Sequence, residues 1–287
     1  MHKILALVLV AAAAIVPAVA HAQAAPDTLG RIKAAKAINV AYSDVSLPFS
    51  FDGADKLPAG YSIDLCKRVI AQIARTVGVA DLKVNWLRGS APERLQMIAG
   101  GRADLECANT TQTQSRLANV DFSGLTFVDA GGFLVKGGSS VQRISDLAGK
   151  RIAVRKGTTT EARLNETLKA RLVNATVVTV DDPREGVALL ESGAADAMAG
   201  DKVALIGLAV QAKEPGKLAL LAEEFSFEPY AMALPRHDSA LRLVVNGALT
   251  QIYIGGEIET IYAAWFGKLG RPSPLLVATY LLNSIPE

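Results

Sequence analysis

The stretch Asp104-Leu-Glu-Cys-Ala-Asn-Thr-Thr-Gln-Thr-Gln-Ser-Arg116 carries the strongest signal in the chain. An apolar strand expected at 103–107 runs into a turn of small polar residues, and Arg116 follows five residues after Thr111. Hydroxyl and amide groups at the mouth of a strand suit a small polar ligand, and the guanidinium fork of arginine matches a carboxylate. No catalytic motif accompanies these residues. The segment therefore predicts carboxylate recognition rather than a chemical reaction.

The same segment closes a β-α-β-α-β pattern in the first half of the chain. Apolar residues in the first helix recur at helical spacing, and two glycines end the second helix. The expected strands are 37–42, 82–87 and 103–107, and the expected helices are 60–73 and 92–99. Strands that alternate with helices in this way predict a parallel sheet.

The pattern repeats in the second half of the chain. The expected strands are 151–154, 175–180 and 196–199. One expected helix opens in the segment 157–161 and extends to about residue 172, and a second spans 183–192. Extended apolar segments at 126–135 and 230–234 flank this unit, and helical stretches follow at 241–254 and 258–266.

The two units predict an α/β protein with two Rossmann-like lobes joined by two extended hinge crossings. Lobe one is expected to comprise 23–130 plus 232–287, and lobe two 131–231. Ligands of such sheets bind at the carboxyl ends of the strands, so both lobes are expected to face a shared cleft.

The N-terminus reads as a secretory signal peptide over residues 1–22. A basic start is followed by an apolar run at 4–20 and by the small-residue pattern Ala20-His21-Ala22. The alternative is a membrane anchor, but the run is alanine-rich, short for a bilayer span and interrupted by Pro17. We expect an exported, soluble mature chain.

Charge and histidine content exclude several classes of function. The 30 basic and 28 acidic residues nearly balance, so nucleic acid is not an expected partner. Of three histidines, only His237 lies beyond the predicted signal peptide, which excludes a histidine-rich metal site and disfavours a Ser-His-Asp triad. Neither a phosphate loop nor a dinucleotide fingerprint is present. We expect no metal and no cofactor.

The chain contains two cysteines, Cys66 and Cys107. Export favours a disulfide between them, although two buried free thiols remain the alternative. Closing a loop of this length stabilises a fold by roughly 4 kcal/mol in the chain-entropy model. We favour the disulfide.

Three further positions have both an ordinary and a functional interpretation. The segment Gly157-Thr158-Thr159-Thr160-Glu161 is typical of a capped helix N-terminus, whose free N–H groups also suit an anion. Asp201 is either a cap after its strand or an acceptor for an ammonium group. Arg94 is either a surface charge or a ligand contact.

Short motifs in a fixed order extend over nearly the whole mature chain. These are Pro48-Phe49-Ser50, Gly60-Tyr61-Ser62-Ile63-Asp64, Glu93-Arg94, Asp104-Leu105-Glu106-Cys107, Thr110-Thr111, Arg116, Gly157-Thr158-Thr159, Leu190-Glu191-Ser192-Gly193, Asp201 and Trp265-Phe266. In this order the chain resembles a periplasmic solute-binding protein of the polar amino-acid ABC-transporter type, family 3. Within that family it is most similar to the glutamate/aspartate-binding group.

The resemblance implies a set of ligand-binding residues. They are Ser43, Arg94, Asn109, Thr111, Arg116, Thr158, Thr159 and Asp201. Arg116, with Asn109, Thr111 and Thr159, would bind the α-carboxylate of an amino acid. Asp201 would accept its α-ammonium group, and Arg94 would face a side-chain carboxylate.

The chain departs from the acidic-ligand group at four positions. That group commonly has an arginine at the position of Ser43 and a serine at the position of Ala91. It also has a serine at the position of Asn109 and a histidine near Pro183. Only Arg94 remains of the set that binds a side-chain carboxylate. Arg155 or Arg184 would have to replace a missing charge.

The resemblance implies a binding protein rather than an enzyme. It would capture glutamate, aspartate or another polar amino acid in the periplasm and deliver it, as a monomer, to the membrane permease of an ABC transporter. The alternative is an enzyme similar to cyclohexadienyl dehydratase on the same scaffold. Asp201 as an ammonium acceptor favours the binding protein.

Overall fold

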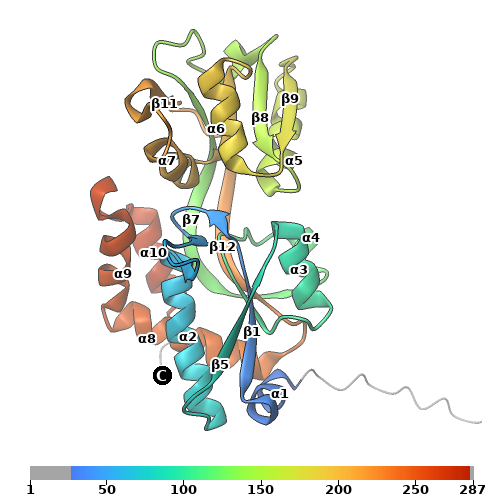
Figure 1. Cartoon of the computed structure of the whole chain (residues 1–287), viewed down its shortest axis with the longest axis vertical. Helices are drawn as coiled ribbons and strands as arrows, with labels where there is room; N and C mark the ends of the chain where they lie inside the picture. The colour runs from blue at the N-terminus through green and yellow to red at the C-terminus, as the bar shows by residue number, and fades with distance from the viewer. Residues whose placement is uncertain (1–26, 285–287) are drawn as a thin grey trace, which may run out of the picture.

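A computed structural model describes residues 27–284, so the predicted signal peptide lies outside the described residues. Two lobes lie one above the other along the long axis of the molecule (Figure 1). Two long antiparallel strands, β7 (Asp121–Lys136) and β12 (Ser226–Leu234), run between them. The predicted architecture of two α/β lobes with two extended crossings is confirmed.

Lobe one contains the first β-α-β-α-β unit. Its parallel strands are β1 (Ala37–Tyr42), β5 (Lys83–Arg88) and β6 (Leu105–Cys107), in the order β5-β1-β6. The helices of this lobe are α1 (Thr28–Ala35), α2 (Tyr61–Val77), α3 (Ala91–Ala99), α4 (Gln114–Leu117), α8 (Ser239–Ile254), α9 (Glu257–Phe266) and α10 (Pro274–Leu282). A small sheet of β2 (Val45–Ser46), β3 (Ser50–Asp52) and β4 (Pro58–Ala59) faces lobe two.

Lobe two repeats this strand order. Its parallel strands are β8 (Arg151–Arg155), β9 (Thr176–Val180) and β10 (Ala197–Asp201), in the order β9-β8-β10. Around them lie α5 (Thr159–Ala170), α6 (Pro183–Ser192), α7 (Lys202–Val210) and β11 (Leu218–Leu220). Three 3-10 turns complete the described chain: Ile144–Leu147, Pro215–Lys217 and Gly267–Leu269.

The crossings merge the sheets of both lobes. β12 pairs with β6 and β7 pairs with β10, so a single mixed sheet extends through the molecule. The predicted lobe boundaries, 130/131 and 231/232, fall inside β7 and β12. We retain them as a proposed division of the chain.

Phe49 forms the centre of the core of lobe one. Its ring contacts Tyr61 of α2, Phe127 of β7, Tyr230 of β12 and Phe266 of α9. One aromatic cluster thus anchors both crossings to the first helix and to the C-terminal helices.

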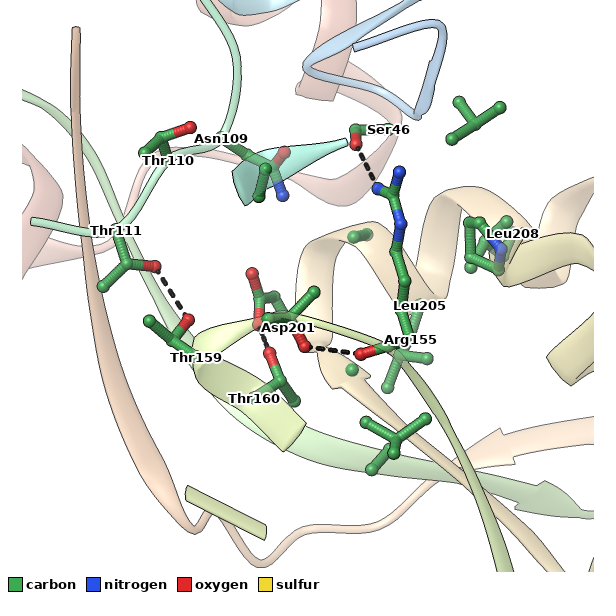
Figure 2. A pocket seen from close by; sticks show the side chains of 18 of the residues that line it. Ser46, Asn109, Thr110, Thr111, Arg155, Thr159, Thr160, Asp201, Leu205 and Leu208 are labelled. Carbon is green, nitrogen blue, oxygen red and sulfur yellow. Dashed lines mark hydrogen bonds between the residues drawn. The ribbon is translucent and has the colours of Figure 1, made fainter. Parts of the chain in front are cut away.

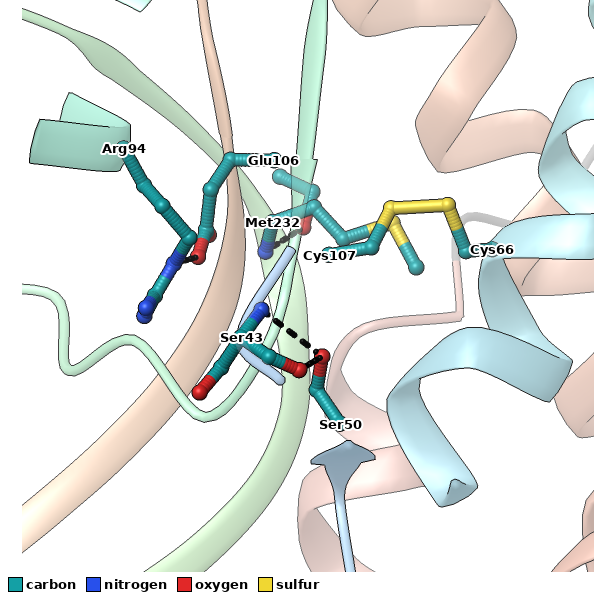
Figure 3. The surroundings of a disulfide bond; sticks show 8 residues. Ser43, Ser50, Cys66, Arg94, Glu106, Cys107 and Met232 are labelled. Carbon is teal, nitrogen blue, oxygen red and sulfur yellow. Dashed lines mark hydrogen bonds and ion pairs between the residues drawn. A yellow bond between two sulfur atoms is a disulfide. The ribbon is translucent and has the colours of Figure 1, made fainter. Parts of the chain in front are cut away.

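The disulfide between Cys66 and Cys107 is confirmed. It joins the buried face of α2 to the end of β6, the strand that leads into the Asn109–Thr111 turn (Figure 3). None of the helices within residues 27–284 is long and apolar enough to cross a membrane.

The structure extends one predicted helix and adds others near the predicted site, among them α4, which carries Arg116, and α7. α2 continues one turn beyond the predicted end at residue 73, until Gly78 adopts a left-handed conformation with φ of 71°. α7 begins directly after Asp201 and was not predicted. Its sequence is apolar on all sides, so it lacks the helical periodicity that would reveal it.

Candidate functional site

A cavity lies between the lobes. Lobe one contributes the β2 segment, α3 and the Asn109–Thr111 turn. Lobe two contributes the ends of β8 and β10 with the first turns of α5 and α7. The carboxyl ends of the central strands therefore meet at a shared cleft, as the sequence predicted.

Arg116 contributes a guanidinium group to this cavity from the short helix α4. Its Nη1 donates to the carbonyl oxygen of Thr111 at 2.6 Å, which holds the side chain against the turn. No carboxylate among residues 27–284 forms an ion pair with it. Burial lowers the pKa of Arg116 below its ordinary value, yet an arginine stays protonated. The site thus contains a cation that lacks a protein counter-ion.

The hydroxyl groups of Thr111 and Thr159 meet across the cleft (Figure 2). They lie 3.3 Å apart, and both donate to Oε2 of Glu228, at 2.6 Å and 2.8 Å. Glu228 belongs to the crossing strand β12 and is buried. One carboxylate oxygen of the crossing therefore holds a residue from each lobe.

The first turn of α5 faces the cavity. The Thr158 hydroxyl accepts a hydrogen bond from the Glu161 N–H and donates to the carbonyl of Arg155, so this side chain serves as the helix cap. The first N–H groups of a helix have no partner within the helix and carry its positive dipole end. A carboxylate at this position would receive donors from α5 and from Arg116.

Asp201 lies at the end of β10, on the lobe-two side of the cavity. Its Oδ1 accepts from the Thr160 hydroxyl at 2.6 Å, and its Oδ2 accepts from the Tyr230 hydroxyl at 2.6 Å. Burial, together with the negative charge of Glu228, raises the pKa of Asp201 to about 6. The carboxyl group is therefore ionised at neutral pH and has spare lone pairs for a cationic group.

A second buried acid, Asp129, lies behind Asp201. The Tyr230 hydroxyl is 3.3 Å from Asp129 Oδ2, and the Val203 N–H donates to the same oxygen. Burial and the charge of Asp201 raise the pKa of Asp129 to about 8. At pH 7 Asp129 carries a proton, so the pair holds one negative charge, located on Asp201.

The charge of Arg94 is paired with a carboxylate of the protein. Its Nε donates to Oε1 of Glu106 at 2.6 Å in a fully buried ion pair (Figure 3). Its other nitrogens donate to the Gly89 carbonyl and the Thr110 hydroxyl. The sequence did not anticipate Glu106 as a counter-ion, because that residue lies on β6, whereas Arg94 lies on α3. The predicted contact of Arg94 with a ligand carboxylate stays a prediction.

Arg155 and Arg184 are the two arginines that could replace the missing charge, and only Arg155 reaches the cavity. Arg155, the last residue of β8, extends across the cavity and donates from Nη1 to the Ser46 hydroxyl of lobe one at 3.2 Å (Figure 2). Arg184 forms an exposed ion pair with Asp182 and does not line the cavity. Burial lowers the pKa of Arg155 from its ordinary value.

Two other predicted residues, Asn109 and Ser43, differ in whether they line the cavity. Asn109 lines the cavity, and its amide has no hydrogen-bond partner within the described part of the chain. Ser43 does not line the cavity. It is fully buried, and its hydroxyl lies 2.7 Å from that of Ser46, so it supports Ser46 from behind.

Four further residues belong to the site without having been predicted from the sequence: Ser46, Thr160, Glu228 and Tyr230. Only Glu228 has a sequence signal, because an acidic residue inside an otherwise apolar strand needs hydrogen-bond donors when it is buried. The other three residues are ordinary in their local sequence. Across residues 27–284, the acidic, histidine and cysteine side chains form no cluster suited to a metal ion.

Comparisons with known proteins place this chain in a family. The model of the bacterial extracellular solute-binding proteins, family 3, matches residues 38–268. The L-glutamate/L-aspartate-binding protein of Pseudomonas aeruginosa is 31% identical over 92% of this chain and 87% of its own length. The glutamate/aspartate import solute-binding protein of Escherichia coli is 28% identical over 85% of this chain and 81% of its own length.

The solved structures show the same fold. The ancestral amino acid-binding protein AncCDT-1, a precursor of cyclohexadienyl dehydratase, superposes with a TM-score of 0.71 and 27% identity, covering 84% of this chain and 100% of that one. The family match covers most of the chain, and it agrees with the two lobes, the crossings and the interlobe cavity. The chain belongs to the bacterial extracellular solute-binding proteins of family 3.

Proposed function

We propose that this protein binds a free α-amino acid in the interlobe cavity and delivers it to the permease of an ABC transporter. The observation that carries the proposal is the pairing of two opposite charges at one cavity. Arg116 lacks a protein counter-ion, and Asp201 is ionised at neutral pH. A zwitterion supplies the matching anion and cation in one small molecule.

In this proposal, the α-carboxylate lies between Arg116 and the N-terminus of α5. An arginine fork and helix N–H groups are both strong donors to a carboxylate. Asn109 adds an amide from lobe one. Thr111 and Thr159 contribute their hydroxyls only if these turn away from Glu228, because each hydroxyl has a single proton to donate.

The α-ammonium group would bind Asp201. The two hydroxyl donors on Asp201 occupy one lone pair on each oxygen, which leaves lone pairs for the ammonium protons. Because the carboxylate partners come from both lobes, binding would favour the closed arrangement of the two lobes.

We further infer a periplasmic location, a monomeric state and binding without catalysis. The family is extracellular, and the relatives described above are named as binding proteins. The competing proposal is turnover of a cyclic carboxylate, because AncCDT-1 is named as a precursor of such an enzyme. Incubation with prephenate or arogenate distinguishes the two, since product formation would contradict simple binding.

The decisive measurement is calorimetric titration of the mature chain with each of the twenty amino acids, after unfolding and refolding to remove any bound ligand. We expect Arg116→Ala to weaken binding by about 2–5 kcal/mol, because the ligand carboxylate loses a buried charged partner. The matched control is Arg163→Ala. Arg163 is an exposed arginine of α5 that is paired with Glu166, so its removal should leave affinity unchanged. Equal affinities of the wild type and Arg116→Ala would refute the assignment.

A further inference from the structure

We propose that Arg155 selects the ligand by binding a side-chain carboxylate, so that the solute is an amino acid with two carboxylates. This inference rests on the proposed function, in which Arg116 and Asp201 bind the α-groups. It assigns the specificity contact to lobe two, opposite the Arg94 position that the sequence favoured.

Three arginines line the cavity: Arg94, Arg116 and Arg155. Glu106 neutralises Arg94 at 2.6 Å, and both of these side chains are almost completely buried. Arg116 and Arg155 form no ion pair with any carboxylate of residues 27–284. The cavity therefore contains two cations without protein counter-ions, and a single α-carboxylate can neutralise only one of them.

The guanidinium of Arg155 has unused donors. One N–H bonds to the Ser46 hydroxyl, and the remaining donors have no acceptor in the described part of the protein. Asp44, Asp181 and Asp182 lie close enough for their charges to act on Arg155, but none of them forms an ion pair with it, and Asp182 is bound by Arg184. A planar guanidinium with free donors fits a carboxylate in a two-point contact.

The arrangement of charges matches an amino dicarboxylate. In Figure 2 the Thr111–Thr159 pair lies at one side of the cavity, the Arg155–Ser46 contact at the other, and Asp201 between them. Arg116 is bonded to Thr111 and so belongs to the first side. The order across the cavity is cation, anion, cation. An acidic amino acid presents carboxylate, ammonium and carboxylate in the same order.

A neutral ligand would leave the half-buried guanidinium of Arg155 without a carboxylate in direct contact. Sites built to pair a polar group discriminate strongly against an analogue that lacks it, because the protein group then stays unpaired. The contact with Ser46 does not remove this cost, since a hydroxyl carries no negative charge. An acidic side chain would instead join Arg155 of lobe two to Ser46 of lobe one through the ligand.

The test is a comparison of acids with their amides. Dissociation constants for glutamate, aspartate, glutamine and asparagine are measured by calorimetry on the wild type, Arg155→Gln and Arg155→Lys. We expect the wild type to prefer the acids by at least about tenfold, and Arg155→Gln to weaken acid binding by about 30-fold or more while amide binding changes less than about threefold. Arg155→Lys keeps the charge but loses the fork, so an intermediate loss is expected for the acids alone.

Arg163→Gln is the matched control. It removes an exposed arginine of the same lobe that is paired with Glu166 and lies outside the cavity, and its acid-to-amide preference should equal that of the wild type. Thermal melts identify variants that fold poorly. If Arg155→Gln melts well below the wild type, the lysine variant alone decides the outcome.

Three results would contradict the proposal in distinguishable ways. Equal losses for acids and amides would show that Arg155 only joins the lobes. A wild type that binds neutral or basic amino acids but no acidic one would overturn the inference and leave amino-acid binding intact. A wild type that binds none of the twenty amino acids would overturn the proposed function, and the inference with it.

Discussion

At the residue scale, the site depends on which carboxylates are ionised. Asp129 and Asp201 flank the Tyr230 hydroxyl, and burial raises the pKa of both acids, to about 8 and about 6. Two neighbouring buried acids rarely ionise together, because each negative charge opposes the other. This pair of acids therefore keeps one negative charge, on the residue that faces the ligand.

This pKa predicts a pH dependence of binding. An ammonium group requires ionised Asp201, so below pH 6 a proton must leave before the ligand binds. Affinity should fall by about tenfold per pH unit below that value. Asp129, with a pKa of about 8, is mostly protonated over the window from pH 7.5 to 5, and Arg116 stays charged, so the change below pH 6 comes from Asp201. Calorimetry over this window checks the expectation with a ligand whose side chain does not titrate, such as glutamine.

A constant affinity between pH 7.5 and 5 would contradict the role of Asp201. The variant Asp201→Asn provides the internal control. It should bind weakly at every pH in the window, because its amide neither titrates nor pairs with an ammonium group.

At the scale of elements, the wall of lobe one depends on a buried ion pair between a helix and a strand. Arg94 of α3 and Glu106 of β6 lie 2.6 Å apart, and Thr110 donates to the same Glu106 oxygen. The other oxygen of Glu106 is buried without a hydrogen-bond partner. The carboxylate therefore depends on Arg94 for most of its stabilisation, and Arg94 fastens α3 beside the ligand-binding turn.

We expect Arg94→Ala to lower the free energy of unfolding by roughly 3–5 kcal/mol, because it leaves Glu106 as a buried, unpaired charge. Urea unfolding of the ligand-free protein measures this loss. The double variant Arg94→Met/Glu106→Gln removes both charges and should recover most of the stability. If Arg94→Ala unfolds like the wild type and loses only acidic ligands, then Arg94 is a ligand contact, as the resemblance implies.

At the scale of the whole molecule, the lobes meet through small contacts around the cavity. Thr159 meets Thr111, Arg155 meets Ser46, and Gly157 packs against Pro92. Each contact joins a residue of lobe two to one of lobe one. The two crossings carry the chain between the lobes, so closure can change these contacts without breaking either core.

Gly157 tests the importance of this closed arrangement. Its φ is 72°, and an added Cβ would lie 2.9 Å from Cγ of Pro92 in the other lobe. We expect Gly157→Ala to weaken ligand binding by about tenfold, because the clash opposes closure. Gly149 has the same φ with nothing near its Cβ position, so Gly149→Ala is the matched control for backbone strain.

Both alanine variants should lose about 1 kcal/mol of unfolding free energy, because each places a side chain in a left-handed conformation. Only Gly157→Ala should lose affinity, as measured by calorimetry. Equal affinities for the two variants would show that the Pro92 contact does not contribute to closure.

The sequence by itself determined the order of most elements, and it indicated the family and favoured the disulfide. Helices and strands follow from apolar spacing and from local signals such as Gly100 and Gly193, which depend on near neighbours only. The position of Arg116 after its turn also depends only on residues nearby in the sequence. Such features can therefore be predicted from the sequence alone.

Only the tertiary structure decided which charges meet. Glu106 neutralises Arg94, Glu228 receives hydroxyls from both lobes, and Arg155 enters the cavity while Arg184 stays outside. The tip of a long side chain lies several bonds from its backbone. Its partners come from segments far away in the sequence, so its position depends on how the lobes pack rather than on its neighbours in the chain.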